Sequence, residues 1–247
     1  MASNLPGPCC FSGFKHEGTP TGTLQVINGV KTYIAKPSGN QEPQNAVLLL
    51  SDVFGVVQNS MLLADDFASN GYLCVLPDLF EEEHLPLDVF EKGTFDIPAW
   101  AARHGPEQVD PILERTISFL RDIVGVEKIA GAGYCFGGKY VARFLKEGKL
   151  DIGYTAHPSY ITFEELQGIE RPLSITAAEL DHIFTRELRH KSEDTLTTTR
   201  QPYQICLYSG VEHGFAVRGD LTVPHNKFCK EQAFIQALAW FDYYTKG

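Results

Sequence analysis

The stretch Gly131-Ala132-Gly133-Tyr134-Cys135-Phe136-Gly137-Gly138 places one cysteine between glycines at an expected junction of a strand and a helix. An apolar run that includes Val126 and Ile129 precedes it, and apolar residues recur with helical spacing over 140–145. A nucleophile on such a turn has a strained backbone and needs small neighbours, so that strand and helix can approach each other. The pattern G-x-C-x-G around Cys135 is therefore typical of a nucleophile elbow with a thiol in place of the usual hydroxyl. An inert buried cysteine is the alternative interpretation.

Composition limits the class of protein. The chain has 247 residues, of which 43% are hydrophobic, which favours one well-buried domain over residues 1–247. A formal net charge of −10 argues against attraction to nucleic acid or to an anionic membrane surface. The six cysteines form neither a dense disulfide framework nor a C-x-x-C metal pattern, which favours a reducing compartment. Because no signal segment or membrane span is recognisable, we expect a cytoplasmic protein. We expect it to be a monomer or homodimer, with a small molecule as its partner.

Two segments interrupt the regular pattern. Residues 1–24 are rich in Gly, Pro, Ser and Thr, and predict an irregular arm laid over the domain. Cys9, Cys10 and His16 in this arm would suit zinc, but a fourth ligand is missing, so we expect no metal. Residues 78–105 are long and aperiodic, which predicts either a lid loop over a pocket or a plain surface loop.

Strands and helices are predicted to alternate along the rest of the chain. Asn28-Gly29 between two short apolar runs predicts a tight antiparallel hairpin. The continuous apolar run 46–50 is typical of a central parallel strand covered on both faces. Further strands are expected over 72–76, before Cys135, and over 152–156, 173–177 and 203–208, with helices over 61–68, 106–124 and 228–244. This order favours an α/β protein with a mostly parallel sheet, helices on both faces, and a site at the carboxyl ends of the strands.

Three reactive side chains are each expected just after a strand: Cys135, then Asp181, then His213. Imidazole titrates near neutral pH and can take the proton of a thiol, and a carboxylate on its other nitrogen would fix its tautomer. Glu179 is the rival acid. Singly, His213 could be a loop histidine and Asp181 a helix N-cap before Ile183. Together they have the nucleophile, acid, histidine order of the α/β-hydrolase fold.

These residues give the chain a resemblance to the dienelactone hydrolase family, and more narrowly to its fungal cytoplasmic branch, over nearly the whole length. It is carried by Gly133-Tyr134-Cys135-Phe136-Gly137-Gly138, Asp181-His182, His213-Gly214-Phe215-Ala216 and Asp52-Val53-Phe54-Gly55-Val56, and in the arm by Cys9-Cys10, Gly13, His16, Gly18-Thr19-Pro20 and Gly22. The resemblance implies an α/β-hydrolase fold and a hydrolase of lactones or activated esters with a Cys-Asp-His triad at Cys135, Asp181 and His213. It requires no metal or organic cofactor.

The resemblance also implies an oxyanion hole made by the backbone N–H groups of Phe136 and Val53. Bacterial members carry a glutamate that holds the resting thiol. Here that position is Asp52, which is one methylene shorter. We therefore expect Asp52 to be the acid that holds the thiol.

Substrate contacts are expected from four further residues. Bacterial members place substrate-binding arginines around the pocket, and Arg218 comes one residue later than their spacing after the histidine. Arg103, in the expected lid, is a second candidate cation for a substrate carboxylate. Phe54 and His157, each near the end of an expected strand, complete this set.

Two other functions stay open at the level of sequence. The chain could be a non-catalytic ligand-binding protein that keeps the fold, although an intact triad argues against this. It could also be a thiol redox sensor in which Cys9 or Cys10 resolves an oxidised Cys135. If the chain is an enzyme, esters and lactones are favoured over peptides, because a thiolate is itself a good leaving group and expels an amine poorly.

Overall fold

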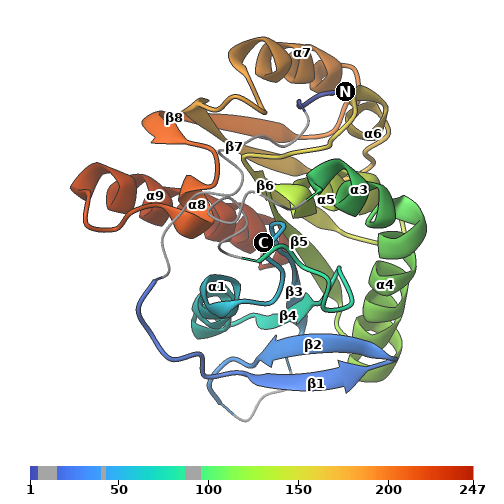
Figure 1. Ribbon diagram of the computed structural model, residues 1–247. Coiled ribbons are helices and arrows are strands. Elements are labelled where there is room, and N and C mark those ends of the chain that lie inside the picture. Colours follow the sequence, from blue (N-terminus) through green and yellow to red (C-terminus); the bar gives the residue numbers. More distant parts are fainter. Residues whose placement is uncertain (5–15, 40–42, 87–95, 247) are drawn as a thin grey trace.

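The computed structural model describes residues 1–4, 16–39, 43–86 and 96–246. Within them an eight-stranded sheet runs through the molecule in the order β1-β2-β4-β3-β5-β6-β7-β8 (Figure 1). Its strands are β1 (Thr23–Ile27), β2 (Val30–Ala35), β3 (Asn45–Leu50), β4 (Leu73–Pro77), β5 (Lys128–Tyr134), β6 (Ile152–Ala156), β7 (Leu173–Leu180) and β8 (Tyr203–Glu212). The pairs β1–β2 and β2–β4 are antiparallel, and the others are parallel. The mostly parallel sheet expected from the sequence is confirmed.

Helices cover both faces of this sheet. They are α1 (Gln58–Ser69), α3 (Ile97–Arg103), α4 (Pro106–Ser118), the π-helical η2 (Phe119–Val124), α5 (Phe136–Phe144), α6 (Phe163–Gln167), α7 (Arg186–Thr197), α8 (Phe215–Arg218) and α9 (Pro224–Thr245). One buried cluster includes side chains from α4, α5 and α6, and a second includes side chains from α1 and α9. The expected arrangement of helices on both faces is confirmed.

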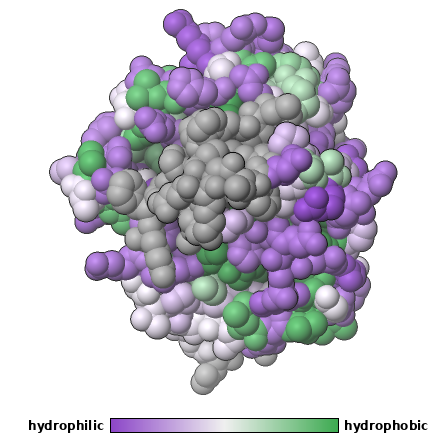
Figure 2. Space-filling model, in the orientation of Figure 1, coloured by the Kyte–Doolittle hydropathy of each residue, from purple (hydrophilic) through white to green (hydrophobic). Residues whose placement is uncertain are grey.

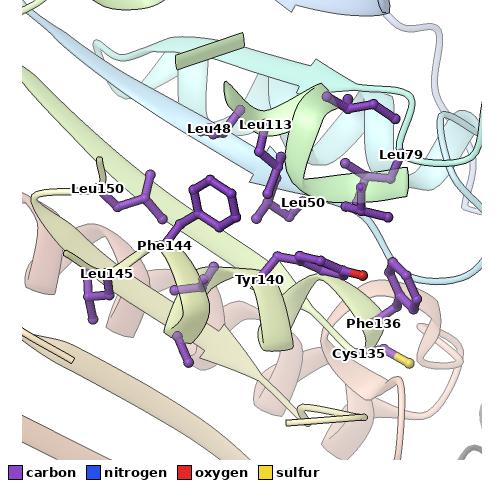
Figure 3. Close-up of a cluster of buried hydrophobic side chains, with 14 of the residues drawn as sticks. Leu48, Leu50, Leu79, Leu113, Cys135, Phe136, Tyr140, Phe144, Leu145 and Leu150 are labelled. Carbon is purple, nitrogen blue, oxygen red and sulfur yellow. The ribbon is translucent and has the colours of Figure 1, made fainter. Parts of the chain in front are cut away.

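The central strand β3 divides its side chains between the two clusters. Leu48 and Leu50 belong to the first cluster and Val47 and Leu49 to the second, and all four are fully buried. Burying one such leucine contributes about 1.5–3 kcal/mol, so an apolar run without alternation is what a strand covered on both sides requires. Figure 3 shows the first cluster, with Cys135 near one of its ends.

The hairpin between β1 and β2 forms as predicted. Asn28 and Gly29 have φ angles of 49° and 80°. Both are left-handed, as a tight two-residue turn between antiparallel strands requires, and asparagine and glycine adopt this conformation most readily.

The face of the molecule seen in Figure 2 carries mostly hydrophilic residues, with hydrophobic ones in scattered groups.

Several sequence-based boundaries were wrong. Strand β7 continues to Leu180 and β8 to Glu212, and these two residues pair with each other after a register shift. Helices α6 and α7 were not predicted. In the segment 78–105, residues 97–103 form helix α3 rather than a loop, with the side chain of Asp96 accepting a hydrogen bond from the N–H of Ala99. Residues 87–95 of the expected lid lie outside the described residues.

Residues 16–21 of the N-terminal arm are held against α1 and the turn after α8. The backbone N–H of His16 donates to the side-chain oxygen of Asn59, and His16 Nε2 lies 3.0 Å from the carbonyl oxygen of Gly219. Cys9 and Cys10 lie outside the described residues. In the part of the chain that the structure describes, no group of His, Cys, Asp and Glu is arranged to hold a metal. Among the same residues, none of the helices combines the length and the apolar character that crossing a bilayer requires.

Candidate active site

The turn between β5 and α5 holds Cys135 in a strained conformation. Its φ and ψ angles are 51° and −108°, which a residue with a side chain rarely adopts, and its side chain is buried. Glycines make the turn sterically feasible. A Cβ on Gly133 would overlap the backbone of Gly137, and a Cβ on Gly137 would overlap the carbonyl of Leu50 on β3. This is the elbow geometry that the sequence pattern predicted.

The carboxylate of Asp181 meets the imidazole of His213 at the carboxyl ends of β7 and β8. Asp181 Oδ2 is 2.9 Å from His213 Nδ1, and both side chains are buried. The other oxygen of Asp181 accepts the backbone N–H groups of Ile183 and Phe184 at 2.8 and 3.0 Å. The two sequence-based interpretations of Asp181 are therefore compatible. One oxygen accepts the N–H groups of the following turn, and the other contacts the histidine. Glu179 instead accepts the N–H of Gly210, at an exposed position.

The charges at this site support one another. Burial alone would lower the pKa of His213, but the negative charges of Cys135 and Asp181 raise it to about 10. Burial alone would raise the pKa of Asp181, but the charge of His213 and the hydrogen bonds it accepts lower it. A hydrogen bond with Cys135 also contributes to the increase, by less than the charge does. Cys135 therefore acts on His213 mainly through its charge. A negative sulfur and a positively charged imidazole would therefore stabilise each other here.

The two expected oxyanion donors lie at the ends of adjacent strands. Strands β3 and β5 pair in parallel up to Leu50 and Gly133, and the N–H of Gly137 donates to the carbonyl of Ser51 at 3.0 Å. In the described part of the chain, neither Val53 nor Phe136 donates its N–H to a backbone carbonyl of a turn, loop or cap. Neither N–H group is therefore used by the main-chain hydrogen bonds of these turns, as an oxyanion hole would require.

Asp52 forms a buried pair with Arg218. Asp52 Oδ2 is 3.2 Å from Arg218 Nε, but the atoms are not aligned for a hydrogen bond, so the contact is an ion pair. The other oxygen accepts the N–H of Phe54 at 3.0 Å, and the guanidinium of Arg218 lies 5.0 Å from the centre of the Phe54 ring. Burial raises the pKa of Asp52, Arg218 opposes the increase, and the charge of Cys135 adds to it. The carboxylate therefore has charged neighbours on two sides.

The remaining expected substrate contacts lie in different surroundings. Arg103 has a side chain that is 59% exposed, 3.6 Å from Glu83, and it donates to the carbonyl of Ala99 within its own helix. The described contacts of Arg103 therefore stay within the expected lid. His157 is fully buried, with its ring centre 4.9 Å from that of His213. Burial lowers the pKa of His157 well below its usual range, so it is neutral and offers no positive charge.

Sequence reasoning missed two groups beside the elbow. The hydroxyl of Ser159, just after β6, lies 3.4 Å from the sulfur of Cys135. The ring of Phe136 packs against Phe80 and Trp100, with centres 5.0 and 6.0 Å apart, and so joins the elbow to helix α3. Ser159 could have been found from its position just after β6, the strand next to the elbow strand β5. Nothing in the local sequence indicated that the rings of Phe80, Trp100 and Phe136 would meet.

Known proteins resemble this chain over nearly all of its length. The sequence model of the dienelactone hydrolase family matches residues 30–245. The chain is 46% identical to Hydrolase pyvD of Aspergillus violaceofuscus, covering 100% of both chains. It is 32% identical to Dienlactone hydrolase 1 of Gibberella moniliformis, covering 96% of this chain and 93% of that protein. A crystal structure from Klebsiella pneumoniae, assigned as a dienelactone hydrolase, has the same fold, with a TM-score of 0.76 and 18% identity over 91% of this chain and 98% of the other.

Proposed function

Because the chain belongs to the dienelactone hydrolase family, we propose that it opens lactones or cleaves activated carboxylic esters through an acyl-enzyme on Cys135. Membership of the family makes it a hydrolase with the α/β-hydrolase fold. The observation that carries the finer proposal is the buried 2.9 Å contact between Asp181 and His213, next to the strained turn of Cys135. A nucleophile, a base and a group that orients the base are the parts that acyl transfer requires.

In the first half of the proposed reaction, the thiolate of Cys135 attacks the carbonyl carbon and forms a carbon–sulfur bond. The carbonyl oxygen becomes an oxyanion, which the N–H groups of Val53 and Phe136 stabilise. When the oxyanion collapses, the bond between the carbonyl carbon and the ester oxygen breaks, and the leaving oxygen takes the proton of the His213 imidazolium. The product is a thioester on Cys135.

In the second half, water replaces the sulfur. Neutral His213 accepts a proton from the water as its oxygen attacks the thioester carbonyl, and collapse of the second oxyanion expels the thiolate. The imidazolium and the thiolate are thereby restored. For a lactone, the alcohol and the acid remain in one molecule, so one hydroxy acid or oxo acid is released.

A substrate carboxylate would have to compete for Arg218. A hollow of about 400 Å³ is lined by residues of β8, α8 and α9 and includes His213 and Arg218, so a small molecule in it would lie beside the site. Arg218 is paired with Asp52, so a second carboxylate would divide its charge between the two. We retain Asp52 as the proposed holder of the sulfur in its protonated form, because a carboxylate can accept a hydrogen bond from a thiol. Burial and the charge of a thiolate on Cys135 both raise the pKa of Asp52, so its carboxylate opposes the charged form.

Intact-mass analysis after exposure to a panel of activated esters and lactones tests the proposal. The wild-type protein is expected to gain the mass of the acyl group on the peptide that contains Cys135, and to lose it again as product appears. In His213→Ala, the adduct is expected to form far more slowly, because no group accepts or returns the proton.

Absence of any Cys135-dependent adduct or turnover across the panel would reject the proposal. A disulfide between Cys135 and Cys9 or Cys10 that forms with peroxide and is reversed by a dithiol would favour the redox sensor instead. Saturable binding of a lactone without turnover would favour the ligand-binding protein.

Replacing Asp181 with asparagine is expected to lower kcat by about 10³-fold, because the amide no longer holds His213 in the required tautomer. It should also move the alkaline limb of the pH profile. In the wild type, activity is expected to fall as His213 loses its proton near its pKa of about 10. Removal of the Asp181 charge disfavours the imidazolium, so the limb moves to lower pH. Steady-state rates measured across the pH range report both effects.

Glu179→Gln is the matched control, because it makes the same chemical change at the rival acid. Glu179 is exposed and accepts the N–H of Gly210, so its variant is expected to keep the wild-type rate and pH profile. Equal losses in the two variants would contradict the assignment of Asp181.

A further inference from the structure

The segment at the end of β6, residues 156–160, holds the backbone of Cys135 on both sides. The N–H of Cys135 donates to the carbonyl of Ala156 at 3.1 Å, and the N–H of Ser159 donates to the carbonyl of Cys135 at 2.9 Å. The strained residue is thus bonded to one short piece of chain through both of its peptide groups. Any side chain that this segment directs at the elbow is therefore positioned relative to the sulfur.

Close packing and strain keep this segment in place. A Cβ on Gly138 of α5 would overlap the hydroxyl of Thr155 and lie 2.9 Å from Cβ of Pro158, so the elbow helix lies directly against the segment. His157 and Tyr160 have φ angles of 39° and 58°, in the left-handed region that residues with side chains avoid. Such strain persists where the surrounding structure determines the conformation. The segment is thus a fixed support.

Ser159 directs its hydroxyl at the nucleophile. The side chain is fully buried, and its oxygen lies 3.4 Å from the sulfur of Cys135. This is the one side-chain hydrogen bond that Ser159 makes with the described residues. A hydroxyl can accept from a thiol, but with a thiolate it must be the donor. The hydrogen bond to a charged sulfur is the stronger of the two, so the contact favours the charged form.

A buried thiolate needs such a donor, because burial removes the water that would otherwise stabilise it. Among the described residues, Asp52 and His213 interact electrostatically with Cys135, and Arg218, Asp181 and His157 lie beside these two. The carboxylate of Asp52 opposes a second negative charge, neutral His157 adds none, and His213 attracts it. A hydrogen bond from a neutral hydroxyl stabilises the sulfur anion without adding a further charge to this crowded site.

We propose that Ser159 is a positioning residue that donates a hydrogen bond to the thiolate of Cys135 and so holds the nucleophile charged and aimed at the substrate. The proposal rests on the proposed function, in which Cys135 is the nucleophile. It assigns Ser159 a role in the free enzyme, before any substrate binds.

The test compares Ser159→Ala with Ser51→Ala. Ser51 is also a buried serine beside the site, but its hydroxyl has no hydrogen-bond partner among the described residues, so it controls for the loss of a buried hydroxyl. Alkylation of Cys135 by iodoacetamide is followed peptide by peptide across the pH range. In Ser159→Ala, the midpoint of the pH profile of the alkylation rate is expected to rise by about one pH unit. Below this midpoint, Ser159→Ala is expected to be alkylated about tenfold more slowly than the wild type, and well above it at the same rate.

Two further variants complete the test. Ser159→Thr keeps the hydroxyl and is expected to return the midpoint towards that of the wild type. Ser159→Gly removes the hydroxyl without adding volume, and its profile takes the place of that of Ser159→Ala if the latter does not fold. A midpoint in Ser159→Ala or Ser159→Gly that coincides with those of the wild type and Ser51→Ala would overturn the proposal.

Alkylation needs no turnover, so this result is independent of the proposed hydrolysis. A shifted midpoint in a protein that forms no acyl adduct would keep the role of Ser159 and reject the hydrolase mechanism. An acyl adduct with an unshifted midpoint would keep the hydrolase mechanism and reject the role of Ser159.

Discussion

Cys135→Ala is expected to abolish ester and lactone hydrolysis and the acyl adduct together, with kcat falling by about 10⁵-fold or more. In the proposed mechanism, the sulfur is the atom that forms the covalent bond, and no neighbouring group replaces it. The side chain is small and fully buried, so its truncation leaves only a minor cavity and the fold is expected to persist. Steady-state kinetics and intact-mass analysis of the same preparations measure both losses.

Cys135→Ser separates the chemistry of the thiolate from the shape of the site. Serine has nearly the same size, but its hydroxyl stays protonated beside His213, so a rate well below that of the wild type is expected. Thermal unfolding of both variants provides the check on folding. Wild-type turnover by folded Cys135→Ala would show that another residue carries the reaction.

Local patterns were sufficient to predict the elbow and the order of the candidate site. Glycines on both sides of Cys135 follow from the close approach of α5 to β3 and β5, which a Cβ at Gly137 would prevent. The run over β3 indicated a strand covered on both faces, because its apolar residues do not alternate with polar ones. These features depend on short stretches of chain, and a short stretch is visible in a sequence.

Features that depend on pairing between distant residues were not predictable. Strand β7 continues past the expected end at Ala177 because it pairs with β8, up to the contact of Leu180 with Glu212 beyond a register shift. That continuation places Glu179 on the exposed end of the strand and Asp181 at the first position after it. The positions of the two acids therefore depend on a partner strand far along the chain.

Contacts between side chains of different elements were also not predictable from the sequence. Asp52 and Arg218 follow β3 and β8, and Ser159 follows β6, so their meeting depends on the strand order of the whole sheet. Sequence reasoning could place each of these residues near the carboxyl edge of the sheet. It could not show that Asp52 faces a guanidinium, or that a serine approaches the sulfur.

Gly137→Ala is expected to lower the free energy of unfolding by more than about 4 kcal/mol, a loss large enough to leave little folded enzyme. The added Cβ would overlap the carbonyl of Leu50 on β3, and that strand is paired on both sides, with β4 and β5. The N–H of Gly137 also bonds the carbonyl of Ser51 at 3.0 Å, so α5 cannot move away without losing this bond. Urea unfolding followed by circular dichroism measures the loss.

Gly105→Ala is the matched control, because it makes the same substitution at the start of another helix. There a Cβ would meet only the side chain of Gln108, at an ordinary distance of 3.7 Å, and a loss of at most about 1 kcal/mol is expected. Similar stabilities and similar activities of the two variants would contradict the steric account of the elbow. A stable but inactive Gly137→Ala would instead mean that β3 had moved from the elbow, and with it the N–H of Val53 from that of Phe136. Close packing at Gly137 would then serve the oxyanion site more than the fold.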